Sequence, residues 1–159
     1  MNARSGFQTN EISRSLWLRY WSSVEPSEVQ ACVERVTQRN SVVDIRLPRS
    51  GLALMQMRDS ALGDCFYMGE IPWSRAHVRV EGPDGLAGEG AADWMDDRKE
   101  MARHLAILDA VLAFRLDGWE HAQALLLCGQ TLCRQQDVKR FALLESTRVD
   151  FRRLDENDE

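Results

Sequence analysis

The spacing of apolar residues predicts two helices at the start of the chain. In residues 10–22, apolar and aromatic side chains fall three and four positions apart, which is typical of a short amphipathic helix. A second helix begins at Pro26, which suits a first helical turn, and keeps its apolar spacing to about Asn40. Trp17 and Trp21 give the first helix an aromatic face that packs either on the core or on a partner subunit.

The apolar pattern changes from the period of a helix to that of a strand after Ser41. Runs of β-branched and alternating apolar residues follow, separated by the glycine, proline and aspartate residues of turns. The segments that this pattern predicts to be strands are 42–47, 52–57, 65–68, 75–80 and 86–92. Turn residues at 48–51 join the first two strands in a predicted hairpin, and Gly88 and Gly90 indicate a bulge or a close backbone approach.

The second half of the chain is predicted to be mostly helical. Leucine and alanine line one face of a helix over 97–114. A further helix follows over 119–145, with a kink or break at Gly129. Residues 147–152 have extended character and form a predicted arm, and the acidic residues 153–159 form a tail that we expect to be disordered.

This order of elements predicts an α+β fold in a single domain over residues 10–152. N-terminal helices in 10–40 and C-terminal helices in 97–145 pack on an antiparallel sheet of about four to five strands, which occupies 41–92. The extended C-terminal arm over 147–152 completes the domain. The chain has 159 residues, of which 44 % are apolar and 28 % charged, so it can fill one core and is not disordered throughout.

Charge and hydropathy limit the partners and the location of the protein. The formal charge of −5 lacks the basic surface that nucleic-acid binding requires, so we expect no nucleic-acid partner. The first thirty residues contain no apolar stretch of signal-peptide length. The longest apolar run, 124–128, is far shorter than the ~20 residues of a membrane-spanning helix. We therefore expect a cytoplasmic protein without membrane contact.

No complete catalytic motif is present. The four cysteines contain no Cys-x-x-Cys pair, so we interpret them as reduced and mostly buried. A zinc site formed by cysteines and histidines would lack the usual close ligand spacing, and we predict no metal site. The sequence contains neither a phosphate-binding loop nor a metalloprotease helix, whereas a Ser-His-Asp triad assembled from distant residues stays open.

One predicted strand carries candidate anion-binding residues. Alternation over 75–80 places Arg75, His77 and Arg79 on one face, opposite the apolar positions. Two guanidinium groups on one face bind a phosphate or a carboxylate where that face lines a cleft. The alternative is a solvated or interfacial sheet face, which is the more common arrangement in antiparallel sheets.

Several short motifs occur in a fixed order along the chain. They are Tyr20-Trp21, Gly51-Leu52, Gly69-Glu70, Val78-Arg-Val80, Gly88, Asp97-Arg98, Asp109-Ala110 and Thr147-Arg-Val-Asp-Phe151. Together they resemble the PhnG family, a subunit of the carbon-phosphorus lyase core complex, over residues 16–152. The chain departs from the family at Asp96-Asp97-Arg98, which replaces Gly-Arg-Asp, and at Met101, which replaces a histidine.

The resemblance implies a role in the breakdown of organic phosphonates. In this family, PhnG acts with the partners PhnH and PhnI to replace the adenine of ATP by methylphosphonate, which gives α-D-ribose 1-methylphosphonate 5-triphosphate. A later partner, PhnJ, cleaves the carbon-phosphorus bond with an iron-sulfur cluster and S-adenosylmethionine. The resemblance thus implies no cofactor on this chain, with ATP as a substrate of the complex.

We therefore predict an accessory subunit of this transferase that is inactive alone, and we assign no catalytic residue. Guanidinium groups organise polyphosphate oxygens or carboxylates. The candidate phosphate-facing or interface residues are Arg79, Arg98, Arg148 and Asp150. The candidate subunit contacts are Trp17, Trp21 and Phe151. The alternatives are an assembly subunit that makes no substrate contact, in which 147–151 adds a strand or arm to its partner, and an independent small-molecule enzyme.

Overall fold

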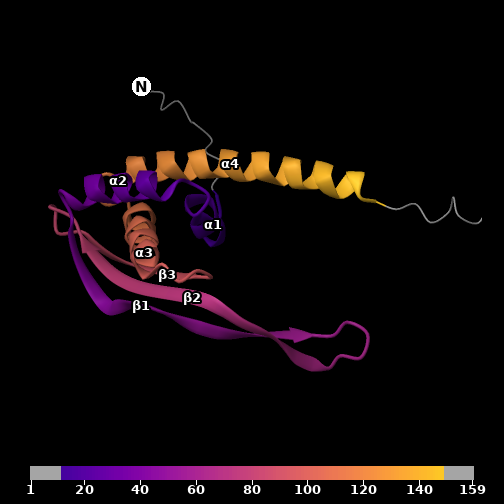
Figure 1. Cartoon of the computed structure of the whole chain (residues 1–159). Coiled ribbons are helices and arrows are strands. Elements are labelled where there is room, and N and C mark those ends of the chain that lie inside the picture. The colour runs from indigo at the N-terminus through magenta and orange to yellow at the C-terminus, as the bar shows by residue number, and fades with distance from the viewer. Residues whose placement is uncertain (1–11, 149–159) are drawn as a thin grey trace, which may run out of the picture.

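Helix α3 (Lys99–Phe114) covers one face of a three-stranded antiparallel sheet in the computed structural model, which describes residues 12–148 (Figure 1). The strands, in their order across the sheet, are β1 (Ser41–Arg58), β2 (Cys65–Glu81) and β3 (Ala87–Trp94). The remaining helices are η1 (Arg14–Leu16), α1 (Trp17–Trp21), α2 (Pro26–Thr37) and α4 (Trp119–Ser146). The predicted α+β class and the antiparallel sheet are confirmed.

Three strands replace the predicted four to five, because β1 and β2 are each longer than expected. The predicted turn at 48–51 is wrong, since β1 continues through it. The register of β1 against β2 shifts between Arg46 and Arg49, so that Pro48 has no partner on β2 and lies in a bulge, where a missing N–H is tolerated. The hairpin turns instead at 59–64, where the Asp59 carboxylate accepts the backbone N–H of Leu62 at 2.9 Å.

Glycines on β3 allow α3 to lie directly on the sheet. A Cβ atom at Gly90 would overlap the backbone of Ala106, and one at Gly88 would overlap the ring of Phe114. The predicted close backbone approach is therefore confirmed. The buried residues that β2 and β3 turn toward α3 are Ser74, Ala76, Val78, Val80 and Ala92. The opposite face of the sheet carries no helix in the part of the chain that the structure describes (Figure 1).

Helix α4 is continuous, so the predicted break at Gly129 is wrong. A Cβ atom at Gly129 would overlap the backbone of Tyr20, which shows that this glycine is the point where α1 and α4 touch. Close by, the indole N–H of Trp21 donates to the carbonyl oxygen of Ala122 at 3.1 Å. The glycine thus serves a helix crossing rather than a bend.

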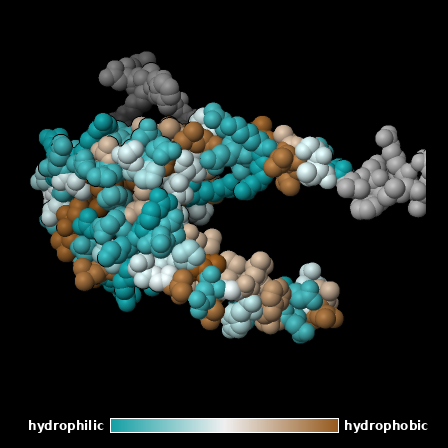
Figure 2. All heavy atoms as spheres, in the orientation of Figure 1, coloured by the Kyte–Doolittle hydropathy of each residue, from teal (hydrophilic) through white to brown (hydrophobic). Residues whose placement is uncertain are grey.

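Two parts of the structure project from the body (Figures 1 and 2). We define the hairpin arm as residues 45–73 and the helix arm as residues 134–148. No residue of the hairpin arm is buried, and every residue of the helix arm is exposed. Figure 2 shows open space between the two arms, with brown apolar residues on both.

The structure describes only the first two residues of the predicted C-terminal arm. Thr147 and Arg148 follow α4 without joining the sheet, and the rest of the predicted arm over 147–152, with the tail over 153–159, lies outside the described residues. All four cysteines are free, but only Cys32 and Cys133 are buried. None of the helices within 12–148 combines the length and apolar content needed to cross a lipid bilayer.

We predict that Gly129→Ala destabilises the protein by about 1–3 kcal/mol, because the new methyl group forces α1 and α4 apart. Helix propensity alone would give the opposite sign, since alanine stabilises a helix interior relative to glycine by about 1 kcal/mol. Urea unfolding measures the difference. The matched control is Gly51→Ala, where nothing lies within 4 Å of the added Cβ. An equal or smaller loss at Gly129 than at Gly51 would contradict the crossing.

Candidate functional site

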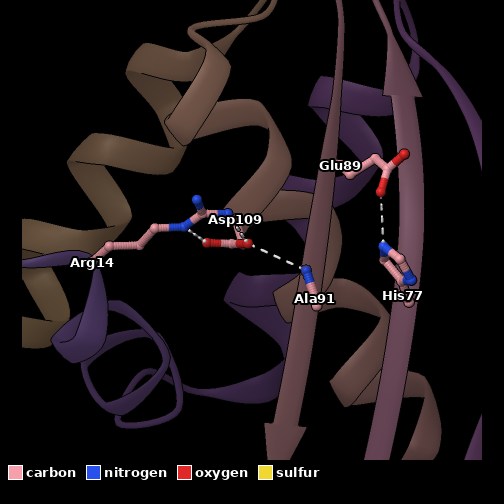
Figure 3. Close-up of polar contacts among 5 residues, drawn as sticks. All are labelled: Arg14, His77, Glu89, Ala91 and Asp109. Carbon is pink, nitrogen blue, oxygen red and sulfur yellow. Dashed lines mark hydrogen bonds and ion pairs between the residues drawn. The ribbon is translucent and has the colours of Figure 1, made fainter.

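A buried carboxylate on α3 joins the N-terminal segment to the edge of the sheet (Figure 3). Asp109 is 4 % exposed. The guanidinium of Arg14 donates two hydrogen bonds to it, from Nε to Oδ1 at 2.8 Å and from Nη2 to Oδ2 at 2.7 Å. The backbone N–H of Ala91 on β3 also donates to Oδ2, at 3.2 Å. Asp109 therefore holds together three parts of the chain that are distant in sequence.

The Arg14–Asp109 contact is an ion pair in which both groups are engaged with each other, and it does not resemble a general acid or base. Both carboxylate oxygens already accept hydrogen bonds, and each has the charged guanidinium as a donor. The hydrogen bond to Asp109 raises the pKa of Arg14 above its ordinary value, so the guanidinium stays charged. The arrangement fits a structural ion pair better than a proton-transfer site.

The predicted cluster of Arg75, His77 and Arg79 does share the face of the sheet that α3 leaves uncovered. Acidic residues of β3 accompany it: Arg75 Nε lies 2.8 Å from Asp93, and His77 Nε2 lies 3.1 Å from Glu89. Figure 3 shows the His77–Glu89 contact across the two strands. Among the described residues, Arg79 alone of the three forms no ion pair within 4.0 Å. Of these three residues, Arg79 is therefore the one that is open to an external anion.

Arg98 is engaged within the chain at the start of α3. Its guanidinium donates to the Asp96 carboxylate at 2.9 and 2.8 Å, and its Cζ lies 4.9 Å from the centre of the Trp94 ring. The hydrogen bond from Arg98 lowers the pKa of Asp96, so that this carboxylate stays ionised near neutral pH. Arg98 lies at the start of α3, Arg79 lies within β2 on the uncovered sheet face, and Arg148 follows α4, so the structure does not assemble these candidates into one site.

The other candidate residues lie in different surroundings. Arg148 is exposed beyond the end of α4, 3.8 Å from Glu145. Trp21 is fully buried and packs inside this chain's own core. Trp17 is half-buried, with its ring 5.8 Å from that of Trp21 in an edge-on arrangement. Asp150 and Phe151 lie outside the described residues. Of the three proposed subunit contacts, only Trp17 is therefore seen partly exposed.

Sequence reasoning missed the role of Asp109, although a signal was present. Asp109 falls in a run of α3 residues that are otherwise small or apolar, and Leu108 and Ala110 on either side are fully buried. A carboxylate inside such a run needs a cation or N–H partner, because burying it alone is costly. The partner, Arg14, lies 95 residues away and no local pattern points to it.

Within residues 12–148, no group of three or more histidine, cysteine, aspartate or glutamate side chains is arranged to hold a metal ion. In a comparison with protein families, a family model described as "Phosphonate metabolism protein PhnG" matches residues 12–155. The match includes both arms, the sheet and the Arg14–Asp109 contact.

We predict that Asp109→Asn lowers the free energy of unfolding by about 1–3 kcal/mol, because Arg14 and the edge of β3 lose a shared charged acceptor. The matched control is Asp93→Asn, which breaks the exposed pair with Arg75 and should cost less than about 1 kcal/mol. A double-mutant cycle with Arg14→Gln, followed by urea unfolding, isolates the pair. A coupling energy of zero would show that the Arg14–Asp109 ion pair does not stabilise the fold.

Stability should also fall as the pH drops through the range in which His104 titrates. Burial lowers the pKa of this half-buried residue from the ordinary 6.5, and Arg103 adds to the shift. The unfolded chain then binds the proton more readily than the folded one, so stability present at neutral pH is lost as the pH falls below about 6.5. We expect His104→Gln to flatten the dependence of Tm on pH between about 7 and 5. An unchanged slope in the variant would assign the effect to other groups.

Proposed function

The chain belongs to the PhnG family of phosphonate metabolism proteins, and on this premise we propose that it is an accessory subunit of the enzyme that displaces adenine from ATP with methylphosphonate. The product is α-D-ribose 1-methylphosphonate 5-triphosphate. The chain is inactive alone in this proposal and works with PhnH and PhnI, and later PhnJ, as partners. The observation that carries it is the pair of exposed apolar arms.

The hairpin arm has the properties of a surface that a partner covers. A two-stranded hairpin is marginally stable in water unless a third strand or a helix packs on it. β3 pairs with β2 only from Ser74 onward, so nothing within 12–148 supports the hairpin arm. It carries six large side chains that are each more than 60 % exposed: Leu47, Leu52, Leu54, Leu62, Tyr67 and Met68. Such a concentration is typical of a protein interface.

The helix arm has the same character. Beyond the buried Cys133, α4 continues to Ser146 without burying a residue. A helical stretch of this length is marginal on its own, because most helix stability in proteins comes from packing of an apolar face. Val138, Phe141, Leu143 and Leu144 are each at least 60 % exposed. The exposed ion pair between Arg19 of α1 and Asp137 adds little support to this arm. Two arms with exposed apolar side chains favour a subunit of an assembly over an independent enzyme.

The charges of the chain bear on whether it also touches substrate. Arg79 is exposed and without a carboxylate partner in the described residues, which suits contact with a triphosphate or with an acidic partner surface. We propose that it faces phosphate. An assembly subunit without substrate contact is the second candidate, because Arg75 and Arg98 are already neutralised by this chain's own carboxylates.

The proposal places the cofactors elsewhere in the complex. ATP is a substrate, the iron-sulfur cluster and S-adenosylmethionine belong to PhnJ, and this chain supplies no cofactor. A cytoplasmic location goes with the use of ATP as a co-substrate.

The arms are tested by co-expression of the chain with PhnH, PhnI and PhnJ. We expect Leu54→Glu on the hairpin arm and Phe141→Glu on the helix arm to lower the yield of co-purified partners at least about tenfold, because burying a carboxylate at an interface is costly. The matched control is Leu86→Glu, at an exposed apolar residue of the body. Because all three residues are exposed, the chain itself should fold. Partner yields equal to that of the control would refute an arm-mediated assembly.

Substrate contact is tested separately in the reconstituted complex. We expect Arg79→Ala to reduce phosphonate-dependent adenine release from ATP about tenfold or more without loss of assembly, since it removes a charge-assisted hydrogen bond. Arg75→Ala, whose guanidinium lies on the same face but is paired with Asp93, should leave the rate unchanged. Equal rates for both variants would favour the assembly-only subunit.

A further inference from the structure

A cavity of about 430 Å³ lies where the N-terminal segment, the end of α3 and the first half of α4 meet. Its volume is within the range of small-molecule sites. The lining residues that matter to the argument are Arg14, Trp17, Arg115, Trp119, Gln123 and Leu126. The cavity is separate from the uncovered sheet face and from both arms, and nothing in the proposed function uses it.

The chemistry of the lining is that of a site for a flat, anionic ligand. Two indoles and the aliphatic side chain of Leu126 supply apolar surface, and the Gln123 amide supplies a donor and an acceptor. Among the described residues, two guanidinium groups line the cavity and no carboxylate does. Because Arg14 is held by Asp109, the charge available to a ligand comes from Arg115.

Arg115 is held in an unusual backbone conformation. It follows α3 with a φ of 50° and is the only residue other than glycine with a positive φ among those described. Glycine is usual at this position after a helix, because a Cβ atom is crowded there. Arginine at a site that favours glycine indicates that its side chain has a use.

The surroundings of Arg115 leave its guanidinium available. Its Cζ lies 5.1 Å from the centre of the Trp119 ring, a contact that orients the group without neutralising it. None of the ion pairs within residues 12–148 includes Arg115. The side chain is exposed and also lines the cavity. The result is an oriented, unneutralised cation beside a flat apolar surface.

We propose that this cavity binds a nucleoside triphosphate, with the base against the indoles of Trp17 and Trp119 and the phosphates on Arg115. Aromatic side chains and guanidinium planes stack on bases, and a guanidinium donates two parallel hydrogen bonds to phosphate. Neither feature alone would select this ligand, but the cavity has both. The inference rests on the proposed function only for the choice of ATP as the probe.

The five tryptophans allow a direct test on the full chain. ATP is titrated into ¹⁵N-labelled protein and the indole N–H signals are followed by NMR. We expect the signals of Trp17 and Trp119 to shift with a common Kd. Trp73 and Trp94 also have an arginine over the ring, Arg75 and Arg98, but do not line the cavity, so their signals should stay in place.

Adenosine and inorganic triphosphate test separately the contacts to the base and the contacts to the phosphates. Adenosine should shift the same two indole signals, but with a Kd at least about tenfold higher than that of ATP, because it lacks the contact with Arg115. Inorganic triphosphate should compete with ATP. Shifts of equal size at all five indoles, no shift at millimolar ATP, or equal binding of adenosine and ATP would overturn the proposal.

Variants at Arg115 distinguish ligand binding from a structural role. Arg115→Gln should weaken ATP at least about tenfold, whereas Arg75→Gln, which removes the same charge and the same kind of ring contact, should change the Kd less than twofold. Arg115→Gly should also abolish the tight binding while raising Tm, because glycine suits the left-handed conformation. A loss of binding that appears only in variants with lowered Tm would show that Arg115 acts through stability.

The outcome is separable from that of the proposed function. If the chain assembles with its partners and supports adenine release but the Trp17 and Trp119 signals do not respond to ATP, the inference fails and the proposed function stands. If ATP binds the cavity but no partner co-purifies, the proposed function fails and the cavity stands.

Discussion

The contact of α3 with β3 sets the position of nearly everything else in this protein. Because Gly88 and Gly90 place no side chain between the helix and the strand, α3 lies against the backbone of the sheet. At that separation the Asp109 carboxylate can reach the N–H of Ala91 at the sheet edge and the guanidinium of Arg14 beyond it. On the other side, Arg103 reaches Asp44 of β1 at 2.8 Å. Larger residues at the two glycines would lift the helix and break polar contacts at both edges of the sheet.

The apolar residues of the chain serve two different purposes. Those on α2, on α3 and on the covered sheet face close a small core of valine, alanine and leucine around Trp21. Those on the hairpin arm and the helix arm remain in contact with water. Since the core includes none of the residues of either arm, the body can fold without any other surface packing on the arms. This division accounts for a chain of ordinary composition that contains a comparatively small core.

Local patterns in the sequence predicted the helices well and the sheet only in part. The helices over 26–37 and 99–114 follow the apolar spacing, since their buried faces repeat with the helical period. The proline and glycine at 48–51 predict a turn, yet on an edge strand with a bulge Pro48 is tolerated. Gly129 likewise predicts a break in a helix, whereas its role depends on Tyr20, a residue of another helix. The Arg14–Asp109 pair and the Arg115 cavity depend on contacts between distant segments, which no local pattern encodes.

The free edge of β1 has a consequence for how a cell must make this protein. β1 is 18 residues long and, within residues 12–148, pairs only with β2, so the backbone groups along its other side are open to an extended chain. Copies synthesised in excess of their partners are then exposed to strand addition by one another and to recognition by chaperones and proteases. Synthesis of this chain together with a chain that covers the β1 edge would limit that exposure.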